Sequence, residues 1–167
     1  LTGSGTAGME AAIANSFSKG DKILVASVGN FGQRFIKIAK IYGLEVEALE
    51  YRPGTAVDPS AVKATLTKDS DKKIKGVLFQ MNETSTAVLN NVKEIAKVAK
   101  AHGSLVVVDA ISGFLASDLR IDEWGIDIAI IGSQKAFMIP PGLAVVSVSK
   151  DAYAAFQKSD LPKFYLD

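Results

Sequence analysis

The sequence predicts an α/β fold: a three-layer α/β/α sandwich with a mainly parallel sheet. Short apolar runs alternate with helix-like segments along all 167 residues. Each apolar run is largely continuous, which is typical of parallel strands that are covered on both faces. With 48% apolar residues, the chain is long enough to bury the core of one domain.

The first part of the chain predicts three helices and two strands. A glycine-rich loop at residues 3–8 runs into a helix that ends at Lys19-Gly20-Asp21. The strand that follows is broken by Gly29-Asn30-Phe31-Gly32, and the next helix stops at Gly43. Pro59 favours a helix start because its fixed φ suits the first turn. The predicted bounds are strands 22–28 and 45–51 and helices 33–42 and 58–66.

The second part predicts four more strands and two helices. A polar cluster, Asn82–Thr86, ends the first of these strands, and Asn90 or Asn91 caps the helix that runs to His102. Asp109 follows the next strand directly, and Lys135 lies between a buried strand and a Pro-Pro-Gly turn. The predicted bounds are strands 75–81, 104–108, 126–131 and 143–148, with a last helix at 150–158.

Composition excludes several classes of function. Lys and Arg (19) nearly balance Asp and Glu (18), and no basic stripe indicates nucleic-acid binding. The chain has no cysteine and one histidine, so we expect no disulfide, no metal site and no cysteine nucleophile. Without a signal peptide or a long apolar run, we expect a soluble cytoplasmic protein that does not enter a membrane. Because the chain begins at Leu1, we expect it to be a piece of a longer protein.

The unusual polar residues follow the strands. In parallel sheets, ligands bind outside the carboxyl ends of the strands. Phe31, Thr84, Asp109 and Lys135 each come after a different predicted strand, and the loop Ser4-Gly5-Thr6 precedes a helix at the same edge. We therefore expect five separate segments to converge on one rim.

These residue types suggest pyridoxal phosphate. A desolvated lysine is an amine nucleophile for Schiff-base chemistry, and a glycine-rich helix start suits a phosphate group. A buried aspartate needs a cation, which a protonated pyridine nitrogen supplies. The residues alone leave simpler alternatives open: Lys135 as a solvated loop lysine, Asp109 as a cap, and residues 3–8 as a plain turn that matches neither the Walker nor the dinucleotide pattern.

The chain also resembles a known family along essentially its whole length. It is similar to the large domain of class V aminotransferases of pyridoxal-phosphate fold type I, in the alanine–glyoxylate / serine–pyruvate aminotransferase group. The segments that carry the resemblance are Gly3–Thr6, Met9–Ala11, Gly29–Arg34, Asn82–Thr86, Val108–Ser112, Gly132–Ala136, Pro140–Gly142 and Phe164–Asp167.

The resemblance implies a role for each matching residue. Lys135 is the catalytic lysine that forms the aldimine and moves the proton, and Asp109 pairs with the pyridine nitrogen. Phe31 and Ile111 pack on the two faces of the ring, and Thr84 hydrogen-bonds the phenolic oxygen. The residues that hold the phosphate are Ser4, Gly5, Thr6 and Gln134.

Three positions depart from the family pattern. Phe31 stands where relatives carry Trp or Tyr, Thr6 where they often carry His, and Ala87 where Gly is common. These departures bear on substrate preference more than on the cofactor. We expect Arg34 to lie at the surface or an interface and His102 to cap a helix.

The resemblance also implies what the chain does. Residues 1–167 would be an incomplete cofactor-binding large domain of a homodimer, without its N-terminal segment and small C-terminal domain. The expected reaction moves an amino group from alanine or serine to a 2-oxo acid, glyoxylate or pyruvate. The alternatives are a fold-type-I lyase or desulfurase and a non-catalytic α/β binding domain.

Overall fold

The computed structural model describes all residues, 1–167, and confirms the predicted fold class. One six-stranded sheet forms its centre, with strand order β2-β1-β3-β6-β7-β8. The first five strands in this order are parallel, and β8 pairs antiparallel to β7. The strands are β1 (Lys22–Ser27), β2 (Glu45–Glu50), β3 (Ile74–Gln80), β6 (Leu105–Asp109), β7 (Ile128–Gly132) and β8 (Ala144–Val148).

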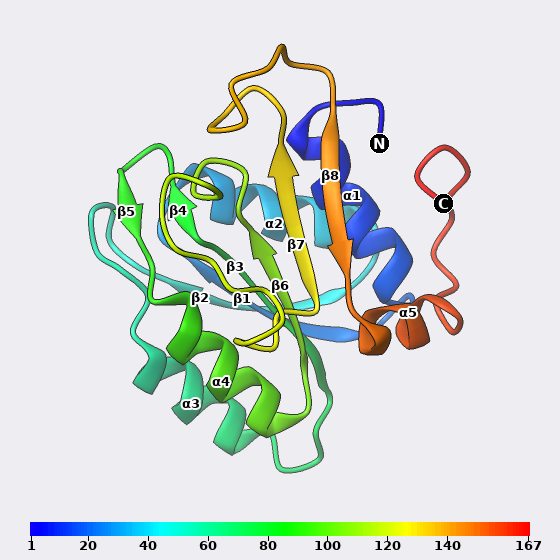
Figure 1. Cartoon of the computed structure of the whole chain (residues 1–167). Coiled ribbons are helices and arrows are strands. Elements are labelled where there is room, and N and C mark those ends of the chain that lie inside the picture. Colours follow the sequence, from blue (N-terminus) through cyan, green and yellow to red (C-terminus); the bar gives the residue numbers. More distant parts are fainter.

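Five helices cover the two faces of the sheet. Figure 1 shows α3 (Pro59–Lys68) and α4 (Val92–His102) side by side on one face. The other face carries α1 (Gly5–Ser16), α2 (Asn30–Ile41) and α5 (Lys150–Phe156). Side chains from alternate positions of the strands enter a separate apolar core on each face, as continuous apolar strands require. None of the helices combines the length and apolarity that crossing a bilayer demands.

The strand order places a rim where a ligand can bind. From β1 the chain passes through α2 to β2 on one side, and then returns through α3 to β3 on the other side. Helices therefore leave in opposite directions between β1 and β3, which opens a crevice at the carboxyl ends of these strands. The first turns of α1 and α2 lie at this same end of the sheet (Figure 1).

Two helices begin earlier than the sequence predicted. α1 starts at Gly5, inside the segment predicted as a loop. Glycine is needed there for packing, since a Cβ on Gly5 would lie 2.3 Å from Ile111 Cδ1 and one on Gly8 2.6 Å from Ile130 Cγ2. α2 starts at Asn30 instead of Gln33, because Glu83, distant in sequence, caps it. Both causes are long-range contacts.

Smaller differences concern the polar cluster and the ends of two helices. Residues 82–89 form a two-stranded hairpin, β4 (Asn82–Glu83) and β5 (Val88–Leu89), which the sequence analysis missed. Asn91 caps α4, whereas the buried Asn90 accepts from the Val57 N–H and donates to the Gln80 carbonyl. The last helix ends at Phe156, two residues earlier than expected.

Candidate functional site

A cavity of about 240 Å³ opens at the carboxyl end of the sheet. The structure places every residue that the sequence analysis assigned to the site on the wall of this cavity, and it adds Arg34 and Ser112. The five expected segments therefore converge. The full lining is Ser4, Gly5, Thr6, Phe31, Arg34, Thr84, Asp109, Ile111, Ser112, Gln134 and Lys135.

The start of α1 forms one side of the cavity. Ser4 occupies the N-cap position but its side chain makes no capping hydrogen bond. The first backbone N–H groups of the helix therefore lack a side-chain acceptor, and the helix dipole adds partial positive charge. Gly5 lets this turn approach Ile111 more closely than any side chain would allow. The arrangement suits an anionic ligand group.

Phe31 is presented by the first turn of α2. The carboxylate of Glu83, which is fully buried, accepts hydrogen bonds from the N–H groups of Phe31 (2.9 Å) and Gly32 (3.2 Å). Glu83 also accepts from the N–H and hydroxyl of Ser85. Gly29 makes room for it, since a Cβ there would lie 2.6 Å from Glu83 Cγ. A residue of β4 thus fixes the aromatic wall of the cavity.

Asp109, the last residue of β6, is a buried carboxylate without a cation partner. Its side chain is 4% exposed, and only Oδ1 accepts a hydrogen bond, from the Ile111 N–H at 3.0 Å. The pKa of Asp109 is raised from 3.8 to about 6, mainly because the carboxyl is buried; the charge of Glu83 adds to this rise, whereas the Ile111 hydrogen bond and the charges of Arg34 and Lys135 oppose it. The free oxygen is an acceptor for a protonated ligand group.

Lys135 lies on the same wall, in the loop between β7 and β8. Its ammonium forms no hydrogen bond or ion pair with the chain, and the residue is half-buried, which is less desolvation than the sequence analysis expected. The loop is pinned by Ser133, whose hydroxyl donates to the Pro140 carbonyl at 2.8 Å and accepts from the Leu143 N–H. The amine is thus held at the cavity without a competing partner.

Thr84 and Ser112 form a small polar group on the cavity wall. Thr84 Oγ1 donates to Ser112 Oγ at 2.8 Å, and Asn82 Nδ2 donates to the same oxygen at 3.0 Å. Ser112 in turn donates to the Asn82 carbonyl. Thr84 must turn its proton away from Ser112 to donate to a ligand oxygen.

The structure adds Arg34 to the predicted site residues. Arg34 lines the cavity, its Nη1 donates to Thr6 Oγ1 at 2.7 Å, and its guanidinium carbon lies 4.7 Å from the centre of the Phe31 ring. The other site residues directly follow strands or begin a helix, whereas Arg34 lies one turn into α2. The spacing of three residues from Phe31 is the signal that could have revealed it, because such residues share a helix face.

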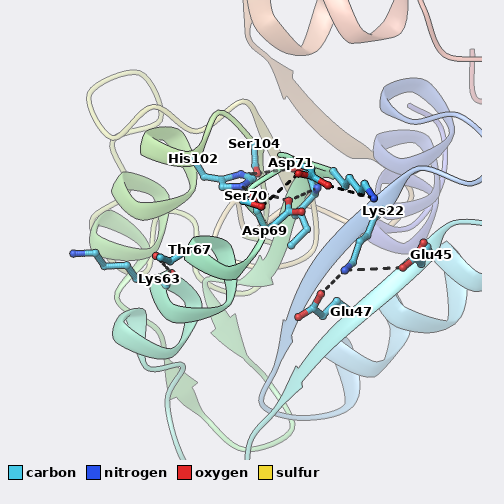
Figure 2. A network of polar contacts seen from close by, with 12 residues as sticks. Lys22, Glu45, Glu47, Lys63, Thr67, Asp69, Ser70, Asp71, His102 and Ser104 are labelled. Atoms are coloured by element: carbon cyan, nitrogen blue, oxygen red, sulfur yellow. Dashed lines mark hydrogen bonds and ion pairs between the residues drawn. The ribbon is translucent and has the colours of Figure 1, made fainter.

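His102 lies far from the cavity, at the amino ends of the strands. Figure 2 shows its ring among Asp69, Ser104 and the end of α4. Nδ1 is 2.8 Å from Ser104 Oγ, and Nε2 is 3.4 Å from Asp69 Oδ2. The cap expected of His102 belongs to Gly103, whose φ of 94° allows the left-handed turn that ends α4. The histidine therefore ties α4 to the loop before β3.

The donor set fits pyridoxal phosphate. The buried Asp109 lacks the cation that a protonated pyridine nitrogen would supply, and the unpartnered Lys135 amine is free to react with an aldehyde. The start of α1 suits a phosphate, and Gly5 at this start leaves no room for a Cβ beside Ile111. Ile111 and Phe31 supply apolar surfaces for a ring between them.

Comparison with known proteins gives one consistent family. The family model for aminotransferase class-V matches residues 1–162. The chain is 45% identical over its whole length to a soluble hydrogenase small subunit of Synechococcus, and 41% identical over 98% of its length to an L-aspartate–glyoxylate aminotransferase of Paracoccus denitrificans. It covers 44% and 42% of these relatives. The solved alanine–glyoxylate aminotransferase of Nostoc superposes on the whole chain with a TM-score of 0.94 at 28% identity, over 44% of its own length.

Proposed function

The chain belongs to the class-V aminotransferases, a family of pyridoxal-phosphate-dependent transaminases, and we propose that residues 1–167 are the cofactor-binding large domain of such an enzyme. The observation that carries this proposal is that Lys135 and Asp109 line the same cavity. The Lys135 amine and one carboxylate oxygen of Asp109 each have no hydrogen-bond partner in the protein. A buried aspartate with a purely structural role would be expected to have a counter-ion within the chain.

The proposed roles follow the walls of the cavity. Asp109 Oδ2 accepts from the ring nitrogen, Phe31 and Ile111 hold the ring, and Thr84 binds the phenolic oxygen. Ser4, Gly5, Thr6 and Gln134 hold the phosphate at the start of α1. Bound there, pyridoxal phosphate supplies an electron sink that stabilises negative charge on the substrate α-carbon.

Lys135 has two tasks in this proposal. Its Nζ would attach the cofactor covalently and, as a free amine, would accept the proton from the substrate α-carbon as a general base. The Ser133 bonds to Pro140 and Leu143 limit the motion of the loop, so that the amine returns to the same place after each proton transfer.

The proposed substrates are a small amino acid, alanine or serine, and a 2-oxo acid, glyoxylate or pyruvate. Glyoxylate is the acceptor named for both the Paracoccus and the Nostoc relatives, which supports it most directly. The named donors differ, aspartate in one and alanine in the other, so the comparisons support no single donor.

The chain spans less than half the length of the relatives it matches, 44% of the Synechococcus protein. We propose that a further N-terminal segment and a small C-terminal domain complete the enzyme, and that it works as a homodimer. A cytoplasmic location stays a prediction. These residues contain no cysteine, so a cysteine nucleophile for the desulfurase alternative would have to come from another part of the protein.

A transamination assay tests this function. The full-length protein that contains these residues is incubated with pyridoxal phosphate, glyoxylate and one of alanine, serine or aspartate, and glycine formation is followed by NMR together with the 2-oxo acid from the donor. We expect equal amounts of glycine and 2-oxo acid, and no glycine with Lys135→Ala. Release of ammonia without glycine would favour the lyase alternative, and the absence of every product would favour a binding domain.

A further inference from the structure

Arg34 carries a positive charge that the protein leaves unpaired at the cavity. No carboxylate lies within 4.0 Å of its guanidinium, whereas Arg120, an exposed arginine, pairs with both Asp118 and Glu123. Two contacts hold Arg34 in place: the Thr6 hydroxyl at 2.7 Å and the Phe31 ring at 4.7 Å. An arginine that is positioned but not neutralised is well suited to a phosphate or carboxylate ligand.

The bond to Thr6 fixes how the threonine hydroxyl is used. Arginine can only donate, so Thr6 Oγ1 accepts from Nη1 and its own proton remains available. No acceptor in the chain takes that proton, and Thr6 lies in the first turn of α1 beside unpaired backbone N–H groups. Arg34 therefore turns Thr6 into a donor at the place where an anionic group would lie.

A second feature of the same cavity also points to a ligand. Asp109, on the same cavity wall, is 4% exposed and leaves one carboxylate oxygen without a partner. The cavity thus holds an unpaired cation in Arg34 and an unpaired anion in Asp109, in addition to Lys135. A ligand with a cationic ring nitrogen and an anionic substituent matches both.

We propose that Arg34 makes this site selective for the phosphorylated form of its ligand: its guanidinium balances the phosphate charge, and through Thr6 it supplies a correctly oriented hydroxyl donor. This inference rests on the proposed function for the identity of the ligand. Arg34 is a specificity-determining residue here, and its contact with Phe31 couples the phosphate end of the cavity to the ring end.

The test uses ligands that cannot react with Lys135. 4-Deoxypyridoxine 5′-phosphate and 4-deoxypyridoxine lack the aldehyde, so their dissociation constants, measured by fluorescence titration, report recognition alone. The readout is the ratio of the two constants, which is the advantage that the phosphate gives. The variants are Arg34→Gln, Arg34→Lys and Thr6→Val, with Lys37→Gln as control, because Lys37 is an exposed cation on the same helix.

We expect Arg34→Gln to lower the phosphate advantage about tenfold or more, because it removes a charge-assisted interaction. Arg34→Lys should retain part of the advantage, and Thr6→Val should lose part of it, while Lys37→Gln matches the wild type. Inorganic phosphate should compete less well in Arg34→Gln by a similar factor. If Arg34→Gln lowers thermal stability, the ratio of the two constants in Thr6→Val tests the same inference, because this variant removes the hydroxyl that Arg34 orients.

Two results would overturn the inference. One is an unchanged ratio in Arg34→Gln and Thr6→Val, and the other is an equal loss of affinity for both ligands, which would mean that Arg34 only supports Phe31. Failure of the proposed function looks different. In that case the phosphate advantage would still depend on Arg34, but no product would form and no ligand would attach to Lys135.

Discussion

Glu83 Oε2 accepts a hydrogen bond from the Phe31 N–H at 2.9 Å, so a side chain from β4 caps the helix that presents the aromatic wall of the cavity. α2 has no side-chain cap of its own, because Gly29 occupies the N-cap position. A carboxylate at a helix N-terminus is stabilised by the helix dipole as well as by the N–H groups. Glu83 therefore joins the stability of the fold to the placement of Phe31.

Replacing Glu83 should destabilise the protein and loosen Phe31. In Glu83→Ala the N–H groups of Phe31 and Gly32 lose their buried acceptor, which costs about 1–3 kcal/mol of unfolding free energy. Urea unfolding measures this loss, and Glu123→Ala, which removes an exposed carboxylate, is the control. An equal loss of unfolding free energy in both variants would show that the Glu83 cap does not stabilise the fold more than an exposed carboxylate does.

Asp109→Asn should stabilise the ligand-free chain at neutral pH. The pKa of Asp109 lies above its ordinary value of 3.8, at about 6, so its ionisation costs stability as the pH rises from about 4 to 6. The amide variant escapes this cost, which amounts to about 3 kcal/mol above pH 6 at 1.36 kcal/mol for each pKa unit. Unfolding at pH 4, 6 and 8 should show a gain that grows and then levels off. A gain independent of pH would contradict the assignment.

Asp69→Asn should destabilise the protein at neutral pH, in contrast to Asp109→Asn. Burial alone raises the pKa of Asp69, but hydrogen bonds from the N–H groups of Ile74 and Lys73 and the charges of His102 and Lys22 bring the pKa below 3.8. The carboxylate therefore stabilises the fold above pH 4, and this contribution disappears as the pH falls through the lowered pKa.

The measurement compares unfolding of Asp69→Asn with the wild type at pH 7 and at pH 2.5. We expect a loss of about 1 kcal/mol at neutral pH and a smaller one in acid. Ligand affinity should not change, because Asp69 lies in the network at the amino ends of the strands (Figure 2). A change in affinity would mean that this network reaches the cavity.

Gly5→Ala should damage the site through Ile111. A Cβ on Gly5 would lie 2.3 Å from Ile111 Cδ1, so either the first turn of α1 or the Ile111 side chain must move. We expect weaker cofactor binding, and Ile111→Val in the same chain should recover part of it by removing Cδ1. If the double variant binds no better than Gly5→Ala, the clash is not the cause.

The sequence was most informative where a local rule applies. Ligand-binding residues follow the carboxyl ends of parallel strands, and this rule is enough to group Phe31, Thr84, Asp109 and Lys135 on one rim. It could not find Arg34, which reaches the cavity from the second turn of α2. It also could not find the role of Glu83, since a cap supplied from 52 residues away leaves no local pattern.

Helix boundaries failed for a related reason. Gly5 and Gly8 indicate a loop by local propensity, yet α1 includes both, because neighbouring side chains leave no room for a Cβ. β8 likewise pairs antiparallel to β7, because the loop that holds Lys135 joins the two strands as a hairpin. The apolar run of β8 alone does not distinguish an antiparallel strand from a parallel one. Tertiary packing decided each of these cases.

The most direct test of the account is covalent attachment at Lys135. The protein is mixed with pyridoxal phosphate, its visible spectrum is recorded, borohydride is added, and the modified peptide is identified by mass spectrometry. We predict a visible band that borohydride removes, one cofactor fixed on the peptide containing Lys135, and neither result with Lys135→Ala. Identical spectra and equal labelling of wild type and Lys135→Ala, or labelling spread over exposed lysines such as Lys37, would contradict the proposal that this cavity is a pyridoxal-phosphate site.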